Sequence, residues 1–467
     1  MRNILFLSLF TAASVLAQTE SPIPGHAAKA QGKMSTPTAD NKNAPPFDPT
    51  NMDTSVKPSD DFFLYADGGW IKRTEIPPEY SRWGSFNQLI EKNNDALHQI
   101  AEKASKTKVD APEVQKVGDY FASGMDEKTI DQMRTKPLHD ELARIDNIKD
   151  RNDVLREIAH LHSMGVTALF GFGSGIDDKN SAMTIANAGQ GGLGMPDRDY
   201  YTKPDADMKD KREKYVAHVT KMLTLLGEPA AKAAEDAKKI MALETKLAEA
   251  SRTRVELRDP QKNYNKMPQA DLQKLTPDWN WAEYFKEIKL DEPGDINVHQ
   301  PDFFKAANEV FKSTSIDDWK TYLRWHLINA TAPELSKDFV NENFNFNETT
   351  LRGTKQIKPR WKRVVTNTDA EIGEALGKLY VAEYFPPEAR TRALELINNL
   401  KEALSDRIKT LEWMDEATKQ EALKKLAAMT VKIGYPTSGA IIPSLRSIAA
   451  RTRLTRCARK ISNSIVT

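Results

Sequence analysis

Residues 412–436 read EWMDEATKQEALKKLAAMTVKIGYP, the most clearly punctuated helical stretch of the chain. Asp415 is placed to accept hydrogen bonds from the backbone N–H groups of a first helical turn. Apolar side chains then recur at helical spacing, which predicts one buried stripe made of Ala422, Leu426, Met429 and Ile433. Gly434 can close the helix in a left-handed conformation, and Pro436 prevents it from resuming.

The composition changes after Pro436. Residues 437–467 carry six basic side chains and no aspartate or glutamate, whereas the whole chain has 66 acidic residues in 467. A window of this length would lack acids by chance roughly once in a hundred. The segment also has no cap and no sustained period, and it holds the only cysteine, Cys457. We therefore expect the folded protein to be cut short at Pro436 and residues 437–467 to be an aberrant, disordered basic tail.

The first residues predict export. Arg2 precedes the apolar run ILFLSLFTAASVLA, which is too short to anchor the chain in a bilayer and ends in residues that a signal peptidase reads. We expect a signal peptide over residues 1–17, no stable membrane anchor, and a periplasmic or secreted protein of bacterial type. Residues 18–50 are rich in Pro, Ala, Ser, Thr and Asn, which is typical of a flexible linker.

Residues 51–436 have the composition of an ordinary globular protein. With 39% hydrophobic residues the chain can bury a sizeable core, and its net charge of +1 gives no general attraction to nucleic acid. The periodicity predicts a mainly α, multi-helix domain with a small β element formed by two strands between residues 166 and 188. Helices are expected at 87–161 (with polar breaks), 214–226, 231–249, 301–312, 316–330, 372–384 and from 387 onward.

Two segments carry local signals for caps, turns and buried faces. Asp60 is a candidate N-cap for a short aromatic helix, and Gly68-Gly69 is expected to turn the chain after it. The helix that begins near Pro387 is expected to bury one apolar face, made of Ile397, Leu400, Leu404, Ile408 and Leu411.

Two glycine motifs suggest chemistry, and the surrounding sequence argues against both. Gly189-x-Gly191-x-x-Gly194 matches a dinucleotide-binding loop, but Pro196 and Asp197 follow where a helix must begin, so a structural turn is favoured. Gly173-Ser174-Gly175 lacks the glycine spacing of a nucleophile elbow.

Histidine spacing argues against a zinc helix. His160 and His162 lie two positions apart, so on a helix they point in divergent directions and are expected to be boundary residues of an amphipathic helix. None of the eight histidines has another four residues away, so the chain contains no His-Glu-x-x-His motif. We predict no catalytic residues and no metal ligands in this chain.

Several stretches together resemble the neprilysin-like zinc metallopeptidases, over about residues 52–436. The landmarks, in the order of that family, are DDFFLYADGGW, SRWGSF, KVGDYFASGMD, GGLGMPDRDYY, RDPQKNYNKM, KPRWKRVV, LGKLYVAEYF and the opening WMDEATKQ…KIGYP stretch. All belong to the family's N-terminal region, which the resemblance implies is mostly helical and walls off a cavity for short peptides.

The resemblance also implies what is missing. In relatives the catalytic half follows the Gly-Tyr-Pro landmark and supplies the substrate-pairing Asn-Ala-aromatic strand, the zinc ligands and the general-base glutamate, none of which this chain contains. One substrate-binding residue remains: in relatives an arginine within the segment matching SRWGSF binds the C-terminal carboxylate of the peptide, and that position is Arg82. A second arginine used by some relatives falls on Ile90. A local pairing of Arg82 is the alternative.

The resemblance therefore implies an exported zinc metalloendopeptidase acting on oligopeptides, in a form that is inactive alone and holds no cofactor, whereas full-length relatives hold zinc. The alternative is a non-catalytic short homologue that binds peptides or a partner protein. Loss of a covering region would also expose apolar surface, so we expect self-association.

Overall fold

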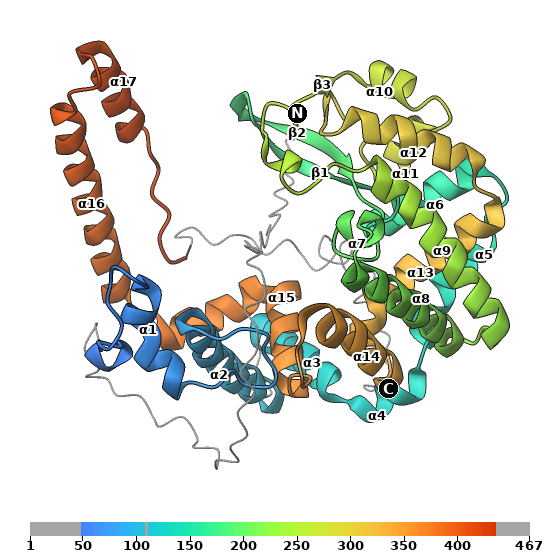
Figure 1. Cartoon of the computed structure of the whole chain (residues 1–467), viewed down its shortest axis with the longest axis horizontal. Helices are drawn as coiled ribbons and strands as arrows, with labels where there is room; N and C mark the ends of the chain where they lie inside the picture. The colour runs from blue at the N-terminus through green and yellow to red at the C-terminus, as the bar shows by residue number, and fades with distance from the viewer. Residues whose placement is uncertain (1–47, 108–110, 436–467) are drawn as a thin grey trace. The chain divides into compact units, whose positions relative to one another are not determined.

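The computed structural model describes residues 48–107 and 111–435, which form many helices and one small sheet (Figure 1). The expected signal peptide at 1–17, the linker up to residue 47 and the expected tail at 437–467 lie outside the described residues. The chain divides into two compact units, residues 1–83 and 84–467. Among the described residues, no helix has both the length and the apolar character needed to cross a bilayer.

The first unit is built around helix α1 (Phe62–Arg73), which follows the short 3-10 helix η1 (Pro49–Asn51). Its N-cap is Asp61, whose carboxylate accepts from the backbone N–H of Leu64 at 2.9 Å, so the expectation for Asp60 is wrong by one residue. Gly68 and Gly69 lie inside α1 rather than at a turn. A Cβ on Gly69 would lie 2.3 Å from the Thr50 carbonyl oxygen, so these glycines let α1 approach the preceding segment closely.

The second unit contains the remaining helices, and most of the long ones lie where the periodicity predicted them. The first group is α2 (Ser85–Lys106), α3 (Pro112–Met125), α4 (Glu127–Met133), α5 (His139–Asp146), α6 (Arg151–Ser163), α7 (Asp199–Thr202), α8 (Ala206–Leu226) and α9 (Ala230–Ala250). The second group is α10 (Gln269–Leu275), α11 (Trp281–Glu287), α12 (Pro301–Ser313), α13 (Ile316–Thr331), α14 (Lys337–Phe344), α15 (Arg360–Tyr384), α16 (Pro387–Thr410) and α17 (Glu416–Ala427). The sequence pattern did not predict the short helices α7, α10, α11 and α14 or the first half of α15.

The sheet has four strands in the order β1-β2-β4-β3. Strands β1 (Phe170–Asp177) and β2 (Asn180–Gln190) are the two strands predicted between residues 166 and 188, and they pair antiparallel. Strand β4 (Ile296–Val298) runs parallel to β2, and β3 (Lys266–Met267) pairs antiparallel with β4. These two strands are only three and two residues long, too short to leave a periodic signal in the sequence.

Two hydrophobic clusters hold the second unit together. The larger one contains four fully buried tryptophans, Trp279, Trp281, Trp319 and Trp325, and joins the sheet to the helices from α5 to α14. The smaller one is formed by α2, α3 and α15 and includes Phe121, Val365 and Leu376. Helix α15 is kinked at Ile372, where φ is −134° and ψ is 32°, which is the residue at which the sequence pattern placed a helix start.

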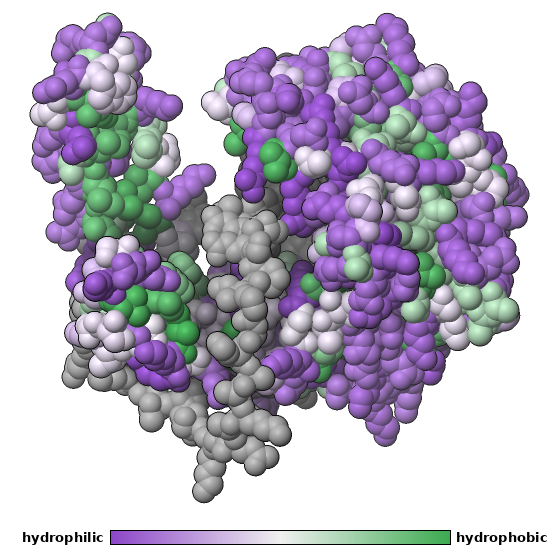
Figure 2. Space-filling model, in the orientation of Figure 1, coloured by the Kyte–Doolittle hydropathy of each residue, from purple (hydrophilic) through white to green (hydrophobic). Residues whose placement is uncertain are grey.

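The α16–α17 hairpin departs from the predicted burial. Asp415 caps α17 as expected, accepting from Thr418 N at 2.7 Å, but the helix ends at Ala427, seven residues before Gly434. On α16 only Ile408 is buried, so the predicted core face is wrong for the described chain. Figure 2 shows hydrophobic side chains along this hairpin, and Leu396, Leu400 and Leu404 are 47–60% exposed. The stripe is amphipathic as predicted, but the described residues cover it only in part: Ile408 is buried, and Ile397 and Leu411 are half-buried.

Candidate functional site

Arg82, the substrate-binding residue implied by the resemblance, lies in the segment between α1 and α2. The chain turns there through a hydrogen bond from Tyr80 N to Pro77 O at 2.9 Å, and the rings of Tyr80 and Trp83 meet edge to face with centroids 4.9 Å apart. The two aromatic rings brace the turn, while Arg82 itself is exposed. Within the described part of the chain no ion pair engages Arg82, so its guanidinium is accessible for a carboxylate.

The glycine-rich loop that follows β2 has a structural role. Helix α7 is a single turn of four residues, so no helix N-terminus is present to hold a pyrophosphate. Gly192 adopts a φ of +78°, and a Cβ on Gly194 would lie 1.9 Å from the Tyr215 hydroxyl. The loop therefore needs glycine for a left-handed turn and for close packing on α8, as the sequence context indicated. Ser174 lies within strand β1, opposite Ala186, and not at a strand-to-helix turn.

His162 is held by two fixed partners. Its Nε2 lies 2.9 Å from the Ala168 carbonyl oxygen and its Nδ1 lies 2.7 Å from the Tyr284 hydroxyl. These distances fit a neutral ring that donates from Nε2 and accepts at Nδ1. Burial lowers the pKa of His162 to about 4, because the charged ring would lose its hydration.

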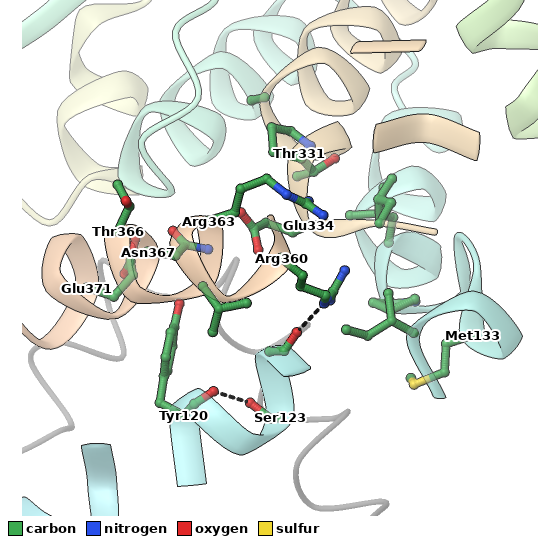
Figure 3. Close-up of a pocket in the computed structure, with 18 of the residues that line it drawn as sticks. Tyr120, Ser123, Met133, Thr331, Glu334, Arg360, Arg363, Thr366, Asn367 and Glu371 are labelled. Carbon is green, nitrogen blue, oxygen red and sulfur yellow. Dashed lines mark hydrogen bonds between the residues drawn. The ribbon is translucent and has the colours of Figure 1, made fainter. Parts of the chain in front are cut away.

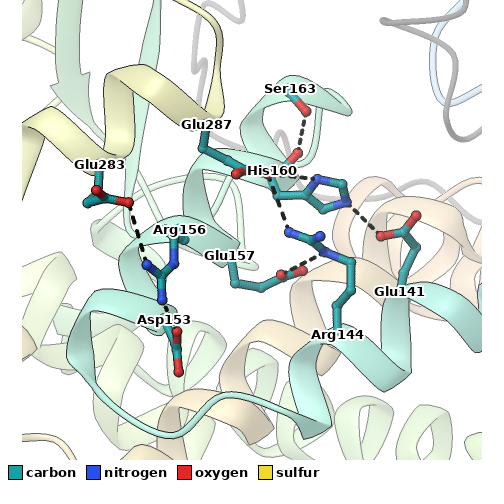
Figure 4. A network of polar contacts seen from close by, with 9 residues as sticks. All are labelled: Glu141, Arg144, Asp153, Arg156, Glu157, His160, Ser163, Glu283 and Glu287. Atoms are coloured by element: carbon teal, nitrogen blue, oxygen red, sulfur yellow. Dashed lines mark hydrogen bonds and ion pairs between the residues drawn. The ribbon is translucent and has the colours of Figure 1, made fainter.

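His160 belongs to a separate polar network on α5, α6 and α11 (Figure 4). Its Nε2 lies 2.7 Å from a Glu141 oxygen, and its Nδ1 lies 3.5 Å from Glu287. Arg144 enters the same network, with Nε donating to Glu157 at 3.1 Å and Nη2 to Glu287 at 3.4 Å. His160 is only 1% exposed, so it is a buried network residue and not the boundary residue predicted from spacing.

This network contains the one group of three potential metal ligands found in the described part of the chain. Glu141, Glu157 and His160 each offer one ligand atom, and these atoms lie within 4.8 Å of one another. Burial raises the pKa of Glu157, partly offset by the charge of Arg144. The guanidinium already supplies the positive charge that these carboxylates need, and it would repel a divalent cation. Arg144 makes this network an ion-pair cluster, in which Glu157 Oε1 is buried without a hydrogen-bond partner among the described residues. The two histidines have different partners, Glu141 for His160 and Tyr284 for His162.

The fold is that of a predominantly helical protein with a small four-stranded sheet. The chain belongs to Peptidase family M13, whose profile matches residues 58–436. This family comprises zinc metallopeptidases that act on peptides.

Individual relatives agree with this assignment. The chain is 30% identical over 406 residues to endothelin-converting enzyme 1 from Mus musculus, covering 83% of this chain and 51% of that protein. It is 28% identical over 408 residues to Neprilysin-3 from Drosophila melanogaster, with 83% and 52% covered. The Mycobacterium tuberculosis zinc metalloprotease Zmp1, in complex with an inhibitor, matches in structure with a TM-score of 0.79 and 32% identity, covering 89% of this chain and 64% of that chain. The chain thus spans about half the length of the curated relatives that it matches.

Proposed function

We propose that this chain forms the helical, substrate-enclosing region of an exported zinc metalloendopeptidase that cleaves oligopeptides, and that these 467 residues do not cleave peptides by themselves. The observation that carries the proposal is the family match over residues 58–436, combined with a sequence that contains no His-Glu-x-x-His motif. Zinc activates the attacking water and polarises the scissile carbonyl in such enzymes. The activity therefore requires zinc ligands beyond those that this sequence supplies.

Uncovered apolar surface supports a role as part of a larger assembly. Helix α16 exposes Leu396, Leu400 and Leu404, and helix α2 exposes Phe86 (80%) and Leu89 (56%). Contiguous apolar faces of this kind are normally covered by another part of a protein or by a partner. In this proposal, the part that covers these apolar faces is the zinc-binding region that the resemblance to the family implies.

Arg82 is proposed to bind the C-terminal carboxylate of the peptide. Its exposure and the brace formed by Tyr80 and Trp83 support this role, because a guanidinium on a fixed turn can form two parallel hydrogen bonds with a carboxylate. Export is proposed from the leader-like residues 1–17, and the mature protein should then begin at Gln18. An intact mass that retains residues 1–17 in the natural host would contradict export.

A chimera tests the proposal directly. Residues 18–436 of this chain are fused to the part of the mycobacterial enzyme that this chain does not match. The chimera should cleave oligopeptides in a chelator-sensitive manner, while the unfused chain should not. Arg82→Gln in the chimera should raise KM about tenfold or more for peptides with a free C-terminus, and should leave KM for their amidated counterparts unchanged.

Lys92→Gln serves as the matched control for Arg82→Gln, because it removes one positive charge at an exposed position of α2. Peptide cleavage by the unfused chain would contradict the proposal. A chimera that folds and binds zinc but does not cleave, while the unfused chain binds peptides, would favour the non-catalytic binding module instead.

A further inference from the structure

A cavity of about 440 Å³ lies within the second unit, between α3, α4, the end of α13 and the first half of α15 (Figure 3). We call it the α15 pocket and define it by Tyr120, Glu334, Arg360, Arg363, Asn367 and Glu371 together with its apolar wall. Its volume is in the range of cavities that bind small ligands. It contains neither Arg82 nor any residue of the Glu141 network.

One side of the pocket is apolar. Ile130 and Met133 of α4, Leu138, and Val364 of α15 form this wall. Such a surface can hold aliphatic side chains or the methylene groups of a ligand, and it provides affinity without fixing orientation. Orientation must come from the charged groups that share the cavity.

The basic groups of the pocket differ in how far they are already paired. Arg360 donates from Nε to the Gly124 carbonyl oxygen at 2.7 Å and approaches Glu127 at 3.4 Å. Arg363 donates only its Nε, to the Lys358 carbonyl oxygen at 3.2 Å, and none of the described carboxylates lies within 4.0 Å of its terminal nitrogens. Loss of hydration and the neighbouring charge of Arg360 lower the pKa of Arg363. The two terminal nitrogens of Arg363 are thus available for a carboxylate.

The two acidic groups of the pocket lie at different distances from the arginines. In Figure 3, Glu371 lies near Thr366 and away from the two guanidinium groups, while Glu334 lies close to them. Loss of hydration alone raises the pKa of Glu371, and no described cation pairs with it. Glu334 is hydrogen-bonded by Asn367 and feels the charges of Arg360 and Arg363, so it is already compensated. Glu371 is the carboxylate that lacks a positive partner.

The spacing of these two groups sets the length of a ligand. Arg363 and Glu371 are eight positions apart on α15, which corresponds to about 12 Å along a helix axis. An extended peptide spans about 3.3–3.6 Å per residue, so two or three residues fill the distance, whereas one amino acid does not.

We propose that the α15 pocket binds a short zwitterionic peptide of two or three residues, with its terminal carboxylate on Arg363 and its terminal ammonium on Glu371. The aliphatic side chains of the peptide lie against Ile130, Met133 and Val364. This site is separate from the proposed role of Arg82, and it needs no zinc.

Calorimetric titration of the whole chain with trialanine tests the site. Trialanine should bind, while N-acetyl-trialanine, trialanine amide and free alanine should each bind at least tenfold more weakly, because each lacks one charged end or the length to reach both. Glu371→Gln should bring trialanine and its N-acetyl form to equal affinity. Arg363→Gln should do the same for trialanine and its amide.

Control variants separate this site from others. Glu395→Gln and Arg392→Gln change equivalent charges at exposed positions of α16 and should leave all affinities unchanged, as should Arg82→Gln. Should Arg363→Gln fail to fold, Arg363→Lys retains the charge but loses the two-pronged geometry, and must still weaken trialanine binding severalfold. No binding of trialanine, equal binding of the blocked peptides by the unchanged chain, or loss of binding on Arg82→Gln alone would each overturn the proposal.

Discussion

The carboxylate of Glu244 accepts a 2.7 Å hydrogen bond from the hydroxyl of Tyr201, the last residue of the glycine-rich landmark. The same oxygen accepts from Tyr215 at 2.7 Å, and the other oxygen accepts from the Trp325 indole at 3.2 Å. Glu244 is fully buried. One carboxylate therefore ties the landmark loop to α8, α9 and α13 inside the larger core.

Removal of this carboxylate should destabilise the second unit strongly. Glu244→Ala leaves the buried hydroxyls of Tyr201 and Tyr215 without their acceptor, while the Trp325 indole keeps its 2.9 Å hydrogen bond to the Tyr215 hydroxyl. We therefore expect a loss of about 3 kcal/mol in the free energy of unfolding. Urea denaturation followed by tryptophan fluorescence measures it. Glu249→Ala, at an exposed position of the same helix, should cost less than about 0.5 kcal/mol. If the two substitutions lowered the free energy of unfolding equally, the hydrogen bonds of Glu244 would make no specific contribution to stability.

Acid should destabilise the protein through His162. The pKa of His162 is lowered from 6.5 to about 4 in the folded state, so the unfolded chain binds the proton more tightly. The contribution of the neutral His162 ring to the free energy of unfolding is fully present above pH 6.5. It is lost as the pH falls toward 4, by up to about 3 kcal/mol. Urea denaturation at a series of pH values should show this slope. It should be reduced in His162→Gln and retained in His139→Gln, which changes an exposed histidine.

The helical fold was predictable because local periodicity and caps are written in adjacent residues. Asp415 caps α17 as its position indicated, and the β1–β2 pair falls where the period changes. The end of α17 was not predictable in the same way. The apolar period continues to Ile433, but the chain leaves the helix at Ala428, just before the β-branched pair Thr430-Val431, which disfavours continuation.

Features that depend on distant partners could not be predicted. The burial of His160 results from Glu141 and Glu287, which lie 19 and 127 positions away in sequence. In the sequence, Gly68 and Gly69 look like turn residues. Their actual role, allowing α1 to approach the preceding segment around Thr50 and Asp53, depends on packing that the sequence pattern does not contain. Arg82 was identified by resemblance alone, and nothing in its local sequence distinguishes it from other exposed arginines.

The exposed stripe of α16 should drive association of the chain. Leu396, Leu400 and Leu404 lie uncovered along one face, so we expect concentration-dependent self-association and binding of a dye that fluoresces on hydrophobic surfaces. Leu400→Glu with Leu404→Glu should reduce both, because two charges on the stripe oppose its burial. Asn398→Glu with Asn399→Glu adds the same charge at exposed polar positions and should change neither. Analytical ultracentrifugation measures association, and a monodisperse chain without dye binding would contradict this prediction.

The final prediction concerns zinc. Tight zinc binding needs several ligands whose charge is not already neutralised, and the Glu141–Glu157–His160 group has Arg144 hydrogen-bonded to Glu157. The purified chain should therefore hold far less than one zinc per molecule by elemental analysis, and should show no peptidase activity with or without added metal. Arg144→Gln removes the competing guanidinium and should raise zinc affinity above that of the unchanged chain, while Arg352→Gln on an exposed surface should not. One tightly held zinc per chain, with chelator-sensitive peptidase activity that disappears in His160→Ala or His162→Ala, would show that this region carries a catalytic site of its own.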